Sequence, residues 1–199
     1  QAGQTTNFTG SIDQVRIYST ALTSSQVTQL YNEKPEVDTS NFKAVTYTGT
    51  SATQYISNVG MDLETSGGLL WIKNRDQTDS HALVDSVRGI ATSGSNYIAS
   101  DATTQEASST NMPSSLEKNG FFVQGSGGRT NTSGEDYVSW VWKGGGTPVT
   151  IGVNSITGST PSIASTVSAN PAAGFSIVRN TGTASYSDTI GHGLTQAPE

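Results

Sequence analysis

The feature that most constrains the fold is the stretch of residues 67–89, which changes from apolar to polar and back. Residues 69–72 form a short apolar run of strand-forming side chains, and residues 81–87 form a second apolar segment. The polar cluster at residues 73–80 lies between them and is typical of a turn. We therefore predict two paired strands joined by a hairpin loop.

The tip of this hairpin concentrates the side chains that could carry out chemistry. Five of them are our candidate receptor-contact residues: Lys73, Arg75, Asp76, Asp79 and His81. The Asp and His residues, with Asp85, could bind a hard cation or act as an acid–base set. An enzyme needs a nucleophile or paired carboxylates in a cleft, and the sequence has no companion motif outside the hairpin. Turn-capping carboxylates and an Asp85–Arg88 ion pair are therefore favoured, and no catalytic residue is assigned.

The composition indicates an all-β protein. Of the 199 residues, 33% are hydrophobic and 13% are charged, and 22 are glycine, a balance typical of β-rich extracellular or virion proteins. The net charge of -6 and the 10 Lys and Arg residues disfavour nucleic acid, because phosphate binding needs clustered basic side chains. The absence of cysteine excludes disulfides and thiolate metal sites. No signal peptide or membrane helix is recognisable, so we expect no membrane insertion and treat the chain as a segment of a longer protein.

The first part of the large β region should contain an antiparallel pair. Residues 42–47 alternate, residues 48–50 (Thr-Gly-Thr) are typical of a turn, and residues 54–59 return. This pattern predicts that the two segments pair with each other.

Further along, residues 96–99 predict another strand, and the polar residues 100–115 predict a surface loop. The dipeptide Asn119-Gly120 between apolar residues predicts a tight hairpin turn with positive φ at both residues. Register is expected to be well specified there.

Residues 136–143 predict a strand with Val138, Trp140 and Trp142 on one face. Indole rings at these positions and at Trp71 could stack on sugar rings, but their places in strands favour burial in the core.

One short helix is predicted near residues 23–32. Thr23 to Gln26 fits a capping box, in which the Thr hydroxyl accepts from a backbone N–H three residues on. Val27, Leu30 and Tyr31 then lie on one helical face, and Pro35 ends the helix.

The first 34 residues also carry a recognisable motif. A strand with Ile12-Asp13-Gln14-Val15-Arg16-Ile17-Tyr18 is followed by Ala21-Leu22 and the short helix. This resembles the C-terminal end of laminin-G-like, concanavalin A-like lectin domains, which usually have a second Asp where this chain has Gln14. In some relatives the Asp at position 13 helps to hold Ca²⁺, so the resemblance makes Asp13 the candidate metal ligand, with a simple turn carboxylate as the alternative. We otherwise expect no cofactor.

A repeat links the two ends of the β region. Phe42, Val45, Thr48-Gly49-Thr50 and Gly60-Met61 recur without a gap as Phe175, Val178, Thr181-Gly182-Thr183 and Gly193-Leu194, at an offset of 133 (175 minus 42). Such an ungapped match predicts a repeated module whose second copy is cut short.

A second resemblance covers most of residues 42–199. It is carried by residues 71–76, 79–81, 85–89, 120–121, 137–143 and 191–194. These segments resemble a repeated module in structural proteins of marine tailed phages, especially cyanophages, which is often found beside lectin-like domains in fibres or appendages. The resemblance implies a virion-surface role and supplies no catalytic residues.

The predicted fold is therefore all-β, with antiparallel β-sandwich or jelly-roll-like modules in tandem. The predicted divisions are the end of a lectin domain, a linker, a first module, a linker or edge segment, and a truncated second copy, at residues 1–34, 35–41, 42–147, 148–173 and 174–199.

The function expected from these features is a non-enzymatic tail-fibre or appendage protein. It would lie at the virion surface, contact other virion proteins and host surface glycans, and assemble as a homo-oligomer, in particular a trimer. The alternatives are an accessory region of a glycan-processing enzyme and a bacterial surface adhesin.

Overall fold

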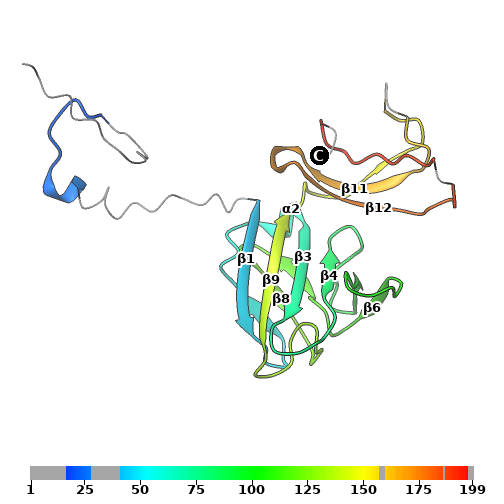
Figure 1. Ribbon diagram of the computed structural model, residues 1–199, viewed down its shortest axis with the longest axis horizontal. Coiled ribbons are helices and arrows are strands. Elements are labelled where there is room, and N and C mark those ends of the chain that lie inside the picture. Colours follow the sequence, from blue (N-terminus) through cyan, green and yellow to red (C-terminus); the bar gives the residue numbers. More distant parts are fainter. Residues whose placement is uncertain (1–16, 28–40, 157–159, 186, 197–199) are drawn as a thin grey trace, which may run out of the picture. The chain divides into compact units, whose positions relative to one another are not determined.

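A computed structural model describes residues 17–27, 41–156, 160–185 and 187–196 (Figure 1). The chain divides into two compact units, Gln1–Val37 and Asp38–Glu199. No helix among the described residues is long and apolar enough to cross a membrane.

In the first unit, residues 24–27 form one helical turn. The backbone N–H of Gln26 donates to Thr23 Oγ1 at 3.3 Å, and the Thr23 N–H donates to Gln26 Oε1 at 2.9 Å. The predicted capping box is confirmed. Asp13 and most of the strand predicted near it lie outside the described residues.

Among the described residues of the second unit, twelve strands form three antiparallel sheets, which confirms the all-β prediction. The strands are β1 (Phe42–Thr48), β2 (Gln54–Ile56), β3 (Gly68–Asn74), β4 (Ala82–Asp85), β5 (Ser95–Ile98), β6 (Ala107–Ser109), β7 (Ser115–Glu117), β8 (Gly120–Val123), β9 (Asp136–Lys143), β10 (Val149–Ile151), β11 (Ser165–Asn170) and β12 (Phe175–Asn180). The short helix α2 (Leu63–Ser66) and the 3₁₀ turn η1 (Pro171–Ala173) complete the list.

The largest sheet has the order β1-β9-β3-β4-β5-β6 (Figure 1). Strand β3 pairs with β4 from Leu69 opposite Asp85 to Ile72 opposite Ala82, so the predicted central hairpin is confirmed. Strand β9 pairs with both β1 and β3, which places Trp140 between Ala44 and Trp71.

The predicted pairing of residues 42–47 with residues 54–59 is wrong. Strand β2 pairs with β8 in a separate sheet of order β2-β8-β7. The Thr-Gly-Thr segment does not close a hairpin, because the Gly49 N–H donates to Glu135 O at 2.8 Å and the Thr50 N–H to Asn131 Oδ1 at 3.0 Å. These bonds turn the chain away from the largest sheet and toward the sheet that contains β2.

The hairpin near Asn119 exists, but its turn lies one residue earlier than predicted. Glu117 pairs with Gly120, so Lys118 and Asn119 form the loop. Of these two loop residues, only Asn119 has positive φ, at 65°. Gly120 is needed for a different reason, since a Cβ there would lie 2.2 Å from the carbonyl oxygen of Ile56.

Residues 100–115 are more ordered than the predicted surface loop. Residues 107–109 form the edge strand β6, which pairs with β5. Met112 is buried against Ala82 and Val84, and the Ser95 hydroxyl donates to Pro113 O at 2.5 Å. A polar stretch of this kind can form an edge strand because its outer edge stays in water.

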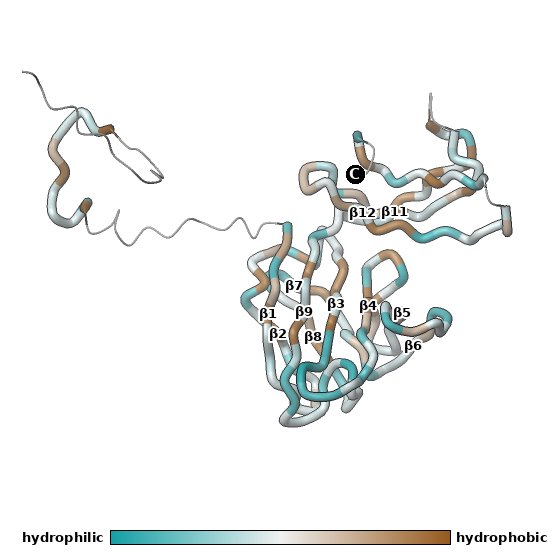
Figure 2. The backbone as a smooth tube through the Cα atoms, in the orientation of Figure 1, coloured by the Kyte–Doolittle hydropathy of each residue, from teal (hydrophilic) through white to brown (hydrophobic). Residues whose placement is uncertain are grey.

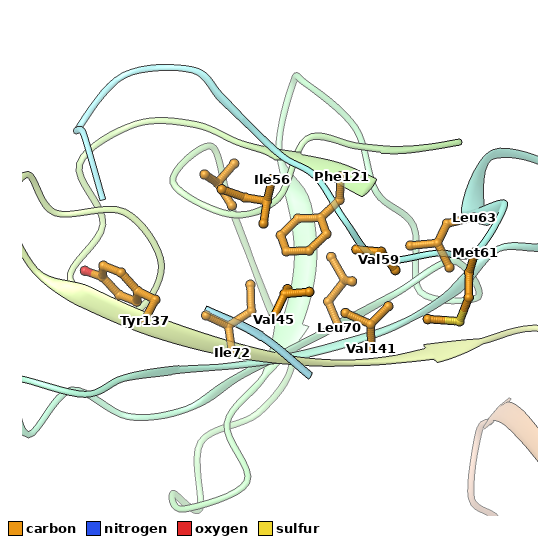
Figure 3. Close-up of a cluster of buried hydrophobic side chains, with 11 residues drawn as sticks. Val45, Ile56, Val59, Met61, Leu63, Leu70, Ile72, Phe121, Tyr137 and Val141 are labelled. Carbon is orange, nitrogen blue, oxygen red and sulfur yellow. The ribbon is translucent and has the colours of Figure 1, made fainter. Parts of the chain in front are cut away.

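The main core lies between the two sheets that contain β9 and β8 (Figure 3). Phe121 is in the middle of the cluster, with Val45, Ile56 and Val141 directed toward it. Alternation along β9 explains the arrangement, because every second residue of an antiparallel strand faces the core. The full cluster is Val45, Ile56, Val59, Met61, Leu63, Leu70, Ile72, Phe121, Val123, Tyr137 and Val141.

The third sheet has the order β10-β11-β12. Residues 148–173, which were predicted to form a linker or edge segment, supply two of its strands. The Gly145 N–H donates to Ser168 Oγ at 2.9 Å, and Asn170 Nδ2 donates to Lys143 O at 3.4 Å. The sheet is therefore bonded to the C-terminal end of β9.

The packing predicts a large effect of truncating Phe121, whose side chain is fully buried. Phe121→Ala should lower the free energy of unfolding by about 3–5 kcal/mol, because it removes buried area and leaves a cavity. Urea unfolding followed by tryptophan fluorescence measures the change. Val149→Ala is the control, since Val149 is 61% exposed; equal losses for the two variants would contradict this core.

Candidate functional site

The loop that follows β3 is hydrophilic, as Figure 2 shows in teal, and its side chains support the turn. Lys73 folds back, and its ammonium group donates to the carbonyl oxygen of Asn74 and, at 2.8 Å, to that of Gln77. The two carbonyl oxygens belong to the turn, and the ammonium group supplies each of them with a hydrogen-bond donor. Lys73 is thus engaged by its own loop.

Asn74 organises this loop, although it was not among the sequence candidates. It is 1% exposed, and its Oδ1 accepts the backbone N–H groups of Asp76 and Gln77 at 3.0 and 3.2 Å. This is an Asx-type turn, in which the side chain mimics a backbone carbonyl. An Asn directly after an apolar strand, opening a polar turn, is the sequence signal that could have identified it.

The amide nitrogen of Asn74 faces four oxygen atoms. Glu135 Oε2 lies at 2.6 Å, Gly128 O at 2.8 Å, Asp79 Oδ2 at 3.2 Å and the Tyr137 hydroxyl at 3.3 Å. An amide has two protons to donate, so the oxygens compete for them. The Asn74 amide therefore donates toward the carboxylates of Asp79 and Glu135, which belong to different loops.

Two tyrosines close the cluster from the core side. Tyr47 and Tyr137 stack with centroids 5.2 Å apart, and their hydroxyls donate to Thr130 O at 2.7 Å and Gly128 O at 3.0 Å. Burial raises the pKa of Tyr47 well above its usual value, and the neighbouring Tyr137 adds to the shift. Burial also raises the pKa of Tyr137. Both phenols therefore stay protonated and act as donors.

The remaining hairpin candidates have separate partners. Asp76 Oδ2 accepts the Asp136 N–H at 2.6 Å, and His81 Nδ1 accepts the indole N–H of Trp71 at 2.8 Å. Arg75 is exposed, and its guanidinium has no hydrogen-bond or ion-pair partner among the described residues. Of the five candidates, Arg75 is the one whose charged group has no partner among the described residues.

Asp85 and Arg88 form the predicted ion pair. Asp85 is fully buried, and its Oδ1 accepts the backbone N–H groups of Val87 and Arg88 at 2.9 and 2.8 Å. The carboxylate therefore fixes the turn after β4. Within the described part of the chain, no group of three or more His, Cys, Asp and Glu side chains is placed to hold a metal ion.

The predicted burial of the tryptophans in the core is wrong. In β9 the core side holds Tyr137, Ser139 and Val141, so Trp140 and Trp142 lie on the outer face, where each is half-buried. The rings form a cluster with Trp71, whose centroid is 5.7 Å from that of Trp140 and 6.4 Å from that of Trp142. The period-2 alternation was visible in the sequence; the choice of face was not.

Trp142 lies between two phenylalanines. Its ring centroid is 4.9 Å from that of Phe42 in β1 and 6.1 Å from that of Phe175 in β12. Four residues along β12, on the same face as Phe175, Arg179 pairs with Glu106 at 3.3 Å. This face of β12 thus contacts Trp142 in β9 and Glu106 in the segment just before β6.

A second aromatic surface lies on the small sheet. Tyr55 is 40% exposed, its ring centroid is 5.1 Å from that of Phe122, and its hydroxyl donates to Lys118 O at 2.8 Å. The two rings and the side chains of Glu64, Glu117 and Lys118 line a shallow hollow. The pairing of Tyr55 with Phe122 depends on the β2–β8 register, which local sequence pattern did not predict.

Residues 38–199 match the family described as "Domain of unknown function (DUF7483)". The chain belongs to this family. The match runs from the start of the second unit across all three sheets. No curated protein and no solved structure gave a significant match.

The Asn74 cluster yields a second prediction. Asn74→Asp would place a third carboxylate beside Asp79 and Glu135 and remove the amide donor, so it should cost about 3 kcal/mol of unfolding free energy at neutral pH. Asn58→Asp, on the exposed surface, is the control. Urea unfolding at neutral pH tests this, and a loss no larger than the control's would contradict the role of Asn74.

Proposed function

We propose that this chain is a non-enzymatic structural segment of a phage tail fibre or surface appendage, built of β-modules in tandem. It would lie at the virion surface, contact other virion proteins and bind glycans of the host surface. Assembly as a homo-oligomer, in particular a trimer, would cover sheet edges such as those of β1 and β6. The resemblances to phage modules and lectin domains support this assignment.

The observation that carries the proposal is the position of Trp142. Phe42 and Phe175 occupy equivalent positions of the repeat, and both pack against this one ring. Successive copies would therefore be joined by side-chain packing in addition to the chain itself. A joint of this kind suits an appendage that must keep its shape over its length.

The contacts of the hairpin carboxylates favour a structural role over the enzyme alternative. Asp76, Asp79 and Asp85 each accept hydrogen bonds from a different part of the structure, and His81 accepts from an indole. A general acid–base pair needs two such groups directed at one substrate. Here they stabilise turns instead.

The hollow beside Tyr55 is the surface best suited to a glycan. Sugar rings present C–H groups that pack on aromatic faces, and hydroxyls that bind carboxylates and ammonium groups. The hollow combines two rings with Glu64, Glu117 and Lys118. Of the tip residues, Arg75 is available to add a contact.

Electron microscopy of virions labelled with antibodies against this chain tests the proposed location. Label on fibres or appendages is expected, and label confined to bacterial surfaces would favour the adhesin alternative.

A competition assay tests the glycan contact. The purified chain should reduce phage adsorption, and Tyr55→Ala with Glu64→Gln should weaken this effect about tenfold, since one lost ring contact and one lost carboxylate contact are together worth about 1.4 kcal/mol. Arg75→Ala is compared in parallel, with thermal unfolding to check the fold. Inhibition of adsorption that is weakened by Arg75→Ala but not by the double variant would assign the contact to the hairpin tip instead.

A further inference from the structure

We propose that the open edge of β12 binds an incoming strand with the sequence pattern of β9, as a further copy of the module would supply. This inference rests on the tandem organisation in the proposed function and is independent of the phage assignment. The edge is available because β11 is the one described strand that pairs with β12.

The backbone supports the equivalence of β12 with β1. Positive φ in a non-glycine residue is uncommon, yet it occurs at Ser51, with φ 57°, and at Ala184, with φ 66°, which are 133 residues apart. Gly60 and Gly193 are separated by the same offset and have φ of 74° and 72°. Neither Ser51 nor Ala184 contributed to the sequence match, so the backbone agreement there is an independent observation.

The layers repeat as well. In the first copy, Val45 of β1 is buried in the same core cluster as Val59 and Met61, which lie on the segment that follows β2. The equivalent of Val45 is Val178. Because Val178 pairs with Val167 of β11, these two side chains lie on the same face of the third sheet.

That face is covered by the segment that carries Gly193. A Cβ at Gly193 would lie 2.8 Å from the Ala169 side chain and 3.1 Å from that of Val167, and Ser165 Oγ donates to Gly191 O at 2.8 Å. The third sheet thus resembles the start of a second sandwich. Strand β12 takes the place of β1, and the chain after it returns over the face that carries Val178.

The first copy shows what completes such a sandwich. Strand β1 pairs with β9, from Phe42 opposite Trp142 to Thr48 opposite Asp136. The Lys143 N–H donates to Asn41 O and the Gly49 N–H donates to Glu135 O, so the odd-numbered residues of β1 face β9. Their equivalents in β12 are Ser176, Val178 and Asn180.

Side chains would match in the same register. An added strand would set its equivalents of Trp142 and Trp140 opposite Phe175 and Ile177, and its core-facing residues beside Val178. Strand addition of this kind combines main-chain hydrogen bonds with side-chain pairing. The side chains of the added strand, which alternate as in β9, thus specify the partner together with the main-chain hydrogen bonds.

The test adds a peptide of residues 134–145 to the chain and follows amide hydrogen exchange by NMR. A tethered form, with the peptide joined behind Glu199 by a flexible Gly/Ser linker, raises its effective concentration into the millimolar range. We expect exchange at Ser176, Val178 and Asn180 to slow about tenfold at a peptide concentration ten times its Kd.

The control peptide carries Ser139→Pro and Val141→Pro, which remove two N–H donors on the edge that faces β1 in the first copy. It should give no protection. Protection by the native peptide alone supports the proposal. Unchanged exchange of β12 with both free and tethered peptide, or equal protection by the proline peptide, would overturn it. Either of these results would leave the microscopy test of the phage assignment unaffected.

Discussion

Strand β9 is hydrogen-bonded on both edges, and most of the structure depends on this pairing. It joins β1 to β3, so the N-terminal strand and the central hairpin belong to one sheet. Its alternation sends Tyr137 and Val141 into the core and Trp140 and Trp142 to the outer face. The core side of β9 packs against the small sheet of β2, β8 and β7. The outer face contacts the third sheet through Trp142 and Phe175.

The polar end of the sheet depends on the buried amide of Asn74. Asn74 caps its own turn and donates toward the carboxylates of Asp79 and Glu135, which come from two loops. Buried polar groups of this kind are stabilising when their hydrogen bonds are satisfied. The charged side chains at the hairpin tip thus stabilise the loops of the protein itself.

Local pattern predicted the strongly alternating strands well and their partners poorly, and it missed β6 in a stretch predicted to be a loop. Alternation was enough for β1, β9 and the β3–β4 hairpin, because the signal is contained in each segment. The pairing of β2 with β8 depends on bonds of the Gly49 segment to residues more than 80 positions away, which no local pattern contains. Burial of Trp142 was misjudged for a related reason. Hydrophobicity indicates that a face is covered, but here the cover over Trp142 includes Phe175 of β12, in a different sheet.

The central claim is that Trp142 joins two copies of the module, and a double-mutant cycle tests it most directly. Unfolding free energies of Trp142→Ala, Phe175→Ala and the double variant give the coupling between the two rings. The packed arrangement predicts about 0.5–1.5 kcal/mol of favourable coupling, the range for aromatic pairs. The pair Trp142 and Val149 should show none. Coupling of zero between Trp142 and Phe175 would contradict the joint.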